Sequence, residues 1–195
     1  GHMPRVLSAC RGLAMIEFLL ALGLFATSVA ALASAQLTAR RAVFEAQQEV
    51  IAGYLVQGIV ERILANPGAG PNYLAEELGD GSEAEPGVSC TLVDCSPAAM
   101  ATFDLAQFEA ALLGSNVRYG ERTAPGLSEP RACIYRVGDT LAVTLNWRGM
   151  VAGASPDSDP CAISGQGLYD DPAGSAGDDR LRRQLTRQVI AVATP

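Results

Sequence analysis

The chain has 195 residues and a formal net charge of -7, and all of its basic residues are arginine. Its one histidine, His2, lies in a Gly1-His2-Met3 start that is typical of a tag-cleavage scar, so residues 1–2 are set aside. Histidine general-base and lysine Schiff-base chemistry are therefore excluded, and the acidic balance disfavours a nucleic-acid partner. We expect a protein that is not an enzyme and needs no cofactor.

The first predicted element is an apolar helix at residues 13–37, whose only charged residue is Glu17. A bilayer core about 30 Å thick requires about 20 apolar residues, so this segment is long enough to span it. It is too long for the apolar core of an ordinary secretory signal, which has about 7 to 15 residues. We therefore predict a short basic leader at residues 3–12, followed by a membrane-spanning helix.

Glu17 is the unusual residue of this segment. A carboxylate at mid-membrane costs about 2.5 to 3.5 kcal/mol on insertion scales, so Glu17 either pairs with a cation or lies at the interface, where it snorkels or is protonated. Charge does not orient the span, because Arg5 and Arg11 precede it and Arg40 and Arg41 follow it.

Helical spacing continues through residues 38–65, where apolar residues recur at steps of three and four. A helix over residues 13–65 would be about 80 Å long, and only about half of it fits in a membrane. Its second half therefore needs a C-terminal domain or other helices to cover its apolar stripe. The residues of that stripe are Val43, Phe44, Val50, Ile51, Tyr54, Leu55, Ile59, Val60, Ile63 and Leu64. Asn66-Pro67-Gly68 ends the helix, because proline disfavours helix in the residue before it.

Residues 66–195 are predicted to form a small α+β domain, with a helix at 98–113 that Ser96 caps and Pro97 begins. The clearest β signal is a hairpin of two runs joined by Gly138-Asp139. Trp147 is expected in the core because it alternates with polar residues. The predicted strands are 88–93, 131–137, 140–148 and 185–193. Three or four antiparallel strands packed on the long helix would bury both apolar surfaces.

Cys10 lies in the predicted leader, which leaves Cys90, Cys95, Cys133 and Cys161 in the rest of the chain. An even number in an exported protein favours two disulfides over a metal site, because no C-x-x-C pair and no further histidine are present. Pairing of Cys133 with Cys161, and of Cys90 with Cys95, is the pairing we put first among three.

The long segment 149–179 is rich in aspartate, which leaves two interpretations open. Oxygen-rich loops can hold calcium, but the spacing does not match an EF-hand, so a solvated acidic loop is the favoured interpretation and no metal site is predicted. The aspartates are Asp157, Asp159, Asp170, Asp171, Asp178 and Asp179.

The residues around the leader junction carry a family resemblance. The stretch RGLAMIE at residues 11–17, followed by the long apolar run, resembles the signal of type IV prepilins and of type II secretion pseudopilins. The resemblance implies that prepilin peptidase cleaves after Gly12 and that the new first residue, Leu13, is methylated. It also implies that Glu17 pairs with the terminal amine of a neighbouring subunit during assembly.

Two further stretches are similar to PilV-type minor pilins. They are ERILANP with the following glycines and Tyr73, at residues 61–73, and CSPAAMATFDLAQF at residues 95–108. The resemblance implies a pilin fold, in which a long N-terminal helix packs on a small antiparallel sheet. It implies a precursor in the inner membrane with its C-terminal domain in the periplasm, which then joins other minor and major pilins in the pilus.

Three functions remain open from the sequence. The first is a minor pilin that supports assembly of the pilus or of its initiating tip complex, with a role in adhesion as an extension. The second is a minor pseudopilin of a type II secretion system, which shares the whole signal. The third is an ordinary membrane-anchored periplasmic binding or enzyme domain, against which stands the lack of a readable catalytic set, metal cluster or phosphate loop.

Overall fold

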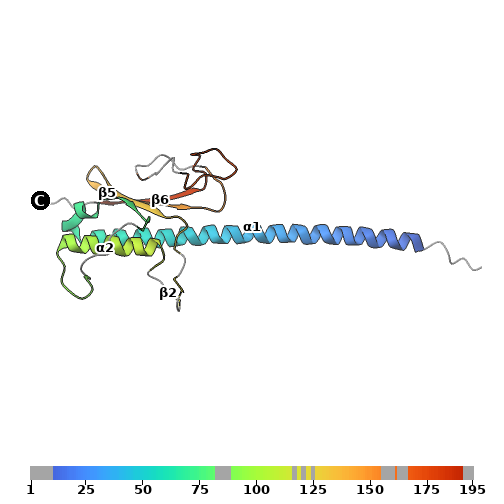
Figure 1. Cartoon of the computed structure of the whole chain (residues 1–195), viewed down its shortest axis with the longest axis horizontal. Coiled ribbons are helices and arrows are strands. Elements are labelled where there is room, and N and C mark those ends of the chain that lie inside the picture. The colour runs from blue at the N-terminus through green and yellow to red at the C-terminus, as the bar shows by residue number, and fades with distance from the viewer. Residues whose placement is uncertain are drawn as a thin grey trace, which may run out of the picture. The chain divides into compact units, whose positions relative to one another are not determined.

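The computed structural model describes residues 11–81, 89–115, 118–119, 122–123, 126–154, 161 and 167–190, and the predicted leader residues 3–10 lie outside this set. The chain divides into two compact units, residues 1–43 and 44–195. The elements in chain order, shown in Figure 1, are α1 (Arg11–Ala65), η1 (Pro67–Tyr73), β1 (Ala75–Leu78), α2 (Pro97–Leu112), β2 (Arg118–Tyr119), β3 (Arg122–Thr123), β4 (Arg131–Val137), β5 (Thr140–Arg148) and β6 (Arg182–Ile190).

The larger unit is built on a four-stranded sheet with strand order β1-β4-β5-β6, in which every neighbouring pair is antiparallel. One face of this sheet packs on residues 44–65 of α1 and on α2, and the core lies between them. The predicted α+β fold, with a long N-terminal helix and a small antiparallel sheet, is therefore confirmed. The short strands β2 and β3 pair with each other only, among the described strands.

The β4–β5 hairpin forms as predicted, with Val137 opposite Thr140 across the two-residue turn. Gly138 has φ of +59°, whereas Asp139 is not in the positive-φ region, which fits a type II′ turn with glycine at its first central position. Trp147 is buried on the helix-facing side of β5 with a 4% exposed surface, which confirms its core position.

The buried face of α1 differs from the predicted stripe. Ala52, Val56, Ile59 and Ile63 are buried at helical spacing, whereas Tyr54 is 76% exposed. The stripe also included Val43, Val50 and Leu64, which are more than half exposed. The prediction favoured the largest apolar side chains, but the buried face of α1 also carries alanine at position 52, which is fully buried. The side chain at position 48, which precedes this face, is a buried glutamine whose Oε1 accepts a hydrogen bond from Ser128 N at 2.9 Å.

The predicted strand at 88–93 is wrong over the described residues 89–93, which form a turn and a bend. A strand from Cys90 to Cys95 would separate their Cα atoms by about 16 Å, but the disulfide holds them 5.6 Å apart. The sheet instead gains β1, which the sequence did not predict because its Ala-Glu-Glu-Leu segment is poor in strand-forming residues. The last strand begins at Arg182, three residues before the predicted start, and residues 191–193 of the prediction lie outside the described set.

The second face of β5 is buried rather than solvated. Ala142, Thr144 and Asn146 are at most 1% exposed. Described parts of the segment 149–181 lie over this face, where the Asn146 amide donates to the Cys161 carbonyl at 3.4 Å. Tyr169 is also buried there, and its hydroxyl donates to the Glu129 carbonyl at 2.9 Å. The acidic segment is therefore partly a covering layer of the sheet.

Candidate subunit-assembly surface

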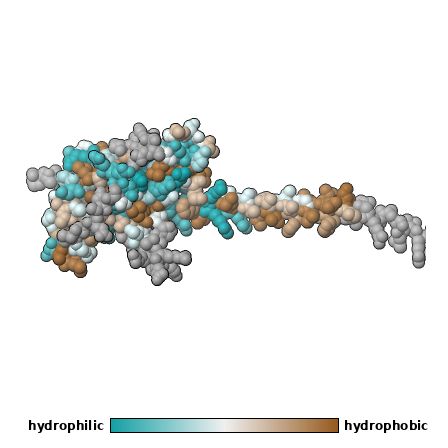
Figure 2. All heavy atoms as spheres, viewed as in Figure 1, coloured by the Kyte–Doolittle hydropathy of each residue, from teal (hydrophilic) through white to brown (hydrophobic). Residues whose placement is uncertain are grey.

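The first unit exposes a long, largely apolar surface, whose charged residues are Glu17, Arg40 and Arg41. Every side chain described from residue 15 to residue 43 is exposed. The large apolar side chains are at least half exposed, for example Phe18 at 67% and Leu24 at 70%. The predominance of brown in this part of the chain in Figure 2 shows the same property. By length and composition the helix from Met15 qualifies as one that can cross a membrane. A surface of this kind requires lipid or other helices around it.

The hydroxyl groups of this surface are satisfied within α1. Thr27 and Ser28 both donate to the Leu24 carbonyl, at 2.9 and 2.7 Å. Ser34 donates to Ala31 and Thr38 to Ser34, at 2.8 and 3.1 Å. Unsatisfied donors are costly in hydrocarbon, so these internal hydrogen bonds suit the surface to an apolar environment.

Glu17 is exposed on the same surface and has no ion pair or hydrogen bond among the described residues. Gly12 and Leu13 lie in the first turn of α1, and the Leu13 side chain lies outside the described set. Residues four apart share a helix face, so the helix places position 17 about one turn from position 13 on the same side. The structure thus brings the predicted cleavage junction and Glu17 together, and gives Glu17 no partner within the described part of its own chain.

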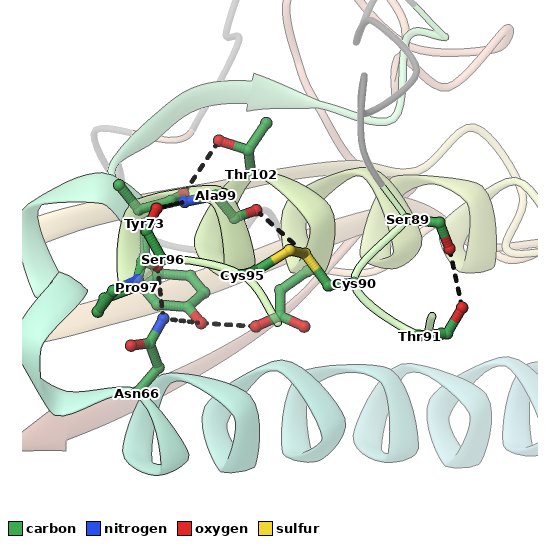
Figure 3. Close-up of a disulfide and its surroundings, with 12 residues drawn as sticks. Asn66, Tyr73, Ser89, Cys90, Thr91, Cys95, Ser96, Pro97, Ala99 and Thr102 are labelled. Atoms are coloured by element: carbon green, nitrogen blue, oxygen red, sulfur yellow. Dashed lines mark hydrogen bonds between the residues drawn. A yellow bond between two sulfur atoms is a disulfide. The ribbon is translucent and has the colours of Figure 1, made fainter. Parts of the chain in front are cut away.

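In the second unit, the two stretches that carry the PilV-type resemblance meet at the end of α1. The Tyr73 hydroxyl donates to Asp104 Oδ2 at 2.6 Å, and Arg62 Nη1 lies 3.4 Å from Asp104 Oδ1. Asn66 donates to the Pro97 carbonyl at 2.8 Å and to the Tyr73 hydroxyl at 3.3 Å. Figure 3 shows Asn66 and Tyr73 beside the start of α2. Residues far apart in the sequence therefore form one cluster.

Burial decides the chemistry of this cluster. Tyr73 is 0% exposed, and burial raises its pKa, as does the hydrogen bond to the Asp104 carboxylate. The phenol therefore remains a proton donor, and the carboxylate of Asp104, itself 7% exposed, has a donor within hydrogen-bond distance. The cluster fastens the end of α1 to α2 and offers no nucleophile or general base to a substrate.

The four described cysteines form two disulfides, Cys90–Cys95 and Cys133–Cys161, which is the pairing put first on sequence grounds. The first closes a short loop before α2, where Ser96 caps the helix by accepting a hydrogen bond from Ala99 N (Figure 3). The second fastens the segment that covers β5 to β4. Both disulfides fit an oxidising compartment.

Glu45 connects α1 to the start of β6 and to the residues that follow β5. Its Oε1 accepts hydrogen bonds from Met150 N at 2.5 Å and Val151 N at 3.1 Å. Its Oε2 lies 3.3 Å from Arg183 Nε at the start of β6. A Cβ at Gly149 would lie 2.9 Å from Glu45 Oε1, so glycine allows this close approach. The sequence did not single out Glu45, because one acid on a helix gives no signal of a partner 138 residues away.

Three described aspartates of the acidic segment, Asp170, Asp171 and Asp178, accept hydrogen bonds from backbone N–H groups, whereas Asp179 pairs with Arg182 at 3.5 Å. Asp170 accepts from Gly177 N at 2.8 Å and from Asp179 N at 3.3 Å. Asp178 accepts from Asp171 N at 3.0 Å, and this hydrogen bond holds the pKa of Asp178 below its usual value. Among the described residues no three metal-ligating side chains gather. Two of the aspartates considered for calcium, Asp157 and Asp159, lie outside the described set.

Residues 34–106 match the family model Tt1218-like, described as type IV pilin Tt1218, which covers less than half of the chain. The match supports a type IV pilin. The matched pilin segment contains the cluster at the end of α1 and the Cys90–Cys95 loop, and the observed long helix with a small antiparallel sheet agrees with a pilin fold. Comparisons with curated proteins and with solved structures found no match.

Proposed function

We propose that the chain is a minor pilin of a type IV pilus, held in the inner membrane as a precursor and then built into the pilus or its initiating tip complex. The observation that carries the proposal is the exposed apolar surface of residues 15–43, whose one acid is Glu17. The match to a type IV pilin family supports it, since pilins are in general structural proteins that assemble with one another.

The proposal gives each residue at the N-terminal junction a role. Prepilin peptidase would cleave after Gly12, and the amine of Leu13 would be methylated and remain cationic. In an apolar surrounding, a carboxylate and an ammonium gain strongly from meeting, because each alone bears a large desolvation penalty. The Glu17 carboxylate of one subunit would therefore seek the terminal amine of its neighbour.

The proposal also gives the second unit a place and partners. The disulfides support a periplasmic position, and other minor and major pilins would contact the chain through its N-terminal helix. The resemblance of two stretches to PilV-type minor pilins is the ground for proposing a minor rather than a major subunit, and residues of both stretches form the cluster at the end of α1. A contribution to adhesion would use the surface of the segment 149–179.

The test is a strain that carries Glu17→Ala, with Gln36→Ala as a control that removes an exposed polar side chain from the same helix. We expect Glu17→Ala to be processed and stable in membranes but lost from sheared filaments, whereas the control is incorporated normally. N-terminal sequencing of the membrane and filament forms should find Leu13 as the first residue. Normal incorporation of Glu17→Ala contradicts the proposed role.

The same strains separate a pilus from a secretion system. A deletion strain is scored for surface pili and for secreted enzymes, and the wild-type gene is returned as a control. We expect pili to be lost or reduced and secretion to be unchanged. Loss of secretion with normal pili would contradict the pilus and indicate a pseudopilin.

A further inference from the structure

Two adjacent arginines follow the uncharged part of α1 in the first unit. Arg40 and Arg41 are exposed, and neither side chain has an ion pair or a hydrogen bond among the described residues. Glu45, four residues after Arg41, is already paired with Arg183 at 3.3 Å. The two guanidinium groups can therefore bind a group from outside the described part of the chain.

The charge rule for membrane topology does not account for this pair. Basic residues gather on the cytoplasmic side of a span, and Arg5 and Arg11 before the apolar segment already fit that side. Arg40 and Arg41 stand at the opposite end of the segment, where the rule disfavours them. Their place calls for a different physical reason.

The spacing of the charged residues along α1 matches the thickness of a bilayer. Residues 18–39, which lie between Glu17 and Arg40, carry no charged side chain. At 1.5 Å per residue this part of the helix is about 33 Å long, and the hydrocarbon core is about 30 Å thick. At the usual tilt of about 20°, the helix would span about 31 Å along the bilayer normal. A span made of these residues places Glu17 at one interface and the two arginines at the other.

The depth of the arginines selects the group that they meet. Phospholipid phosphates lie just outside the hydrocarbon core, and a guanidinium binds a phosphate through two parallel hydrogen bonds. Neighbouring residues of a helix are about 100° apart around its axis, so Arg40 and Arg41 point toward different headgroups. Phosphatidylcholine carries an ammonium group that offsets its phosphate, whereas phosphatidylglycerol does not. The arginines should therefore prefer the anionic lipid.

We propose that Arg40 and Arg41 bind the phosphates of anionic phospholipids and hold α1 at a depth that places Glu17 at the opposite interface. Water and headgroups solvate Glu17 there, so the chain avoids the cost of a carboxylate in mid-membrane. Of the two interpretations of Glu17 left open by the sequence, this depth selects the interfacial one for the chain in the membrane. The lipid binding rests on the apolar segment and the arginines alone, whereas its assignment to the periplasmic leaflet rests on the proposed function.

Lipid binding is tested by NMR on the full chain in phosphatidylcholine bicelles to which phosphatidylglycerol is added. The Nε–H cross-peaks of Arg40 and Arg41 should shift saturably, with a preference of about 5-fold for phosphatidylglycerol at each arginine. Arg40→Gln should leave the response of Arg41 unchanged, because the two bind separate headgroups. Arg136 and Arg187, which are exposed in the second unit, serve as controls and should shift little.

Three outcomes would overturn the lipid site. The first is a shift of the control arginines as large as that of Arg40 and Arg41, which indicates general attraction to a charged surface. The second is a linear shift with no preference between the two lipids. The third is the same shift in neutral bicelles with inorganic phosphate, at the ionic strength of a chloride control, which indicates a site for soluble anions.

The depth is tested by carboxyl modification of the same samples with a water-soluble or a membrane-soluble carbodiimide, read by mass spectrometry. Trypsin releases Glu17 on the peptide 12–40, which holds no other acidic side chain. We expect the water-soluble reagent to modify Glu17, as it modifies the exposed Glu49. Modification of Glu17 by the membrane-soluble reagent alone would overturn the depth. A chain that shows the lipid preference but is absent from sheared filaments would contradict the proposed function and leave the lipid site standing.

Discussion

The two disulfides should contribute unequally to stability, because they close loops of different length. Cys133–Cys161 spans 28 positions and Cys90–Cys95 spans 5. In the chain-entropy treatment, these separations correspond to about 3.5 and about 2 kcal/mol of unfolding free energy. The longer bridge also fastens the segment that covers β5, and its sulfur-bearing residues are 3% and 5% exposed, so its removal loses packing as well.

The assay is thermal unfolding of the full chain in detergent micelles, followed by the fluorescence of Trp147, with paired alanine substitutions of each bridge. For a domain of this size, 1 kcal/mol corresponds to about 2 to 4 °C in Tm. We expect Cys133→Ala/Cys161→Ala to lower Tm by about 7 to 14 °C, and Cys90→Ala/Cys95→Ala by about 4 to 8 °C. A larger loss from the short bridge would refute the reasoning from loop length and burial.

The remaining predictions concern single side chains of the second unit. Glu45→Ala should lower the free energy of unfolding by about 2 to 4 kcal/mol in urea titrations, because it removes an acceptor from two backbone N–H groups and from Arg183; Glu49→Ala should change it by less than about 0.5 kcal/mol. Tyr73→Phe should cost about 1 to 3 kcal/mol in the same assay, because Asp104 loses its donor at 2.6 Å, and an unchanged midpoint would contradict this. The pKa of Asp178 is depressed in the folded state, so its stabilising effect should be complete above the ordinary aspartate pKa and be lost as pH falls through the lower folded value. An NMR titration that finds an ordinary or raised pKa for Asp178 would contradict that prediction.

Local patterns predicted the elements that depend on neighbouring residues. The helix α2 follows from Ser96 as cap and Pro97 at the first position, and the β4–β5 hairpin follows from Gly138-Asp139 between alternating runs. The length of α1 likewise follows from the helical spacing of its apolar residues and from the stop at Asn66-Pro67-Gly68. In each case the determining interactions lie within a few positions of one another.

Features that depend on distant contacts were not predictable. The sequence of β1 is poor in strand-forming residues. The strand forms because its backbone pairs with the edge of β4 and because Arg131 of β4 pairs with Glu77 of β1 at 3.1 Å. The burial of both faces of β5 requires the segment that Cys161 fastens over it. The Glu45 contacts join positions more than one hundred residues apart. No local pattern encodes such pairs.

The two halves of α1 differ in whether their apolar surface is covered by the rest of their unit. This difference bears on how a subunit would leave the membrane. The half in the second unit buries Ala52, Val56, Ile59 and Ile63 against the sheet, so its apolar surface is already covered. The surface of residues 15–43 is covered by nothing within the described part of its unit. Between lipid and a bundle of apolar helices there is little hydrophobic free energy to gain, because lipid tails are as apolar as leucine. Selection of the correct neighbour and axial position therefore falls to side-chain packing and to polar groups. Under the proposed function, Glu17 is the charged group of this surface that would take that role.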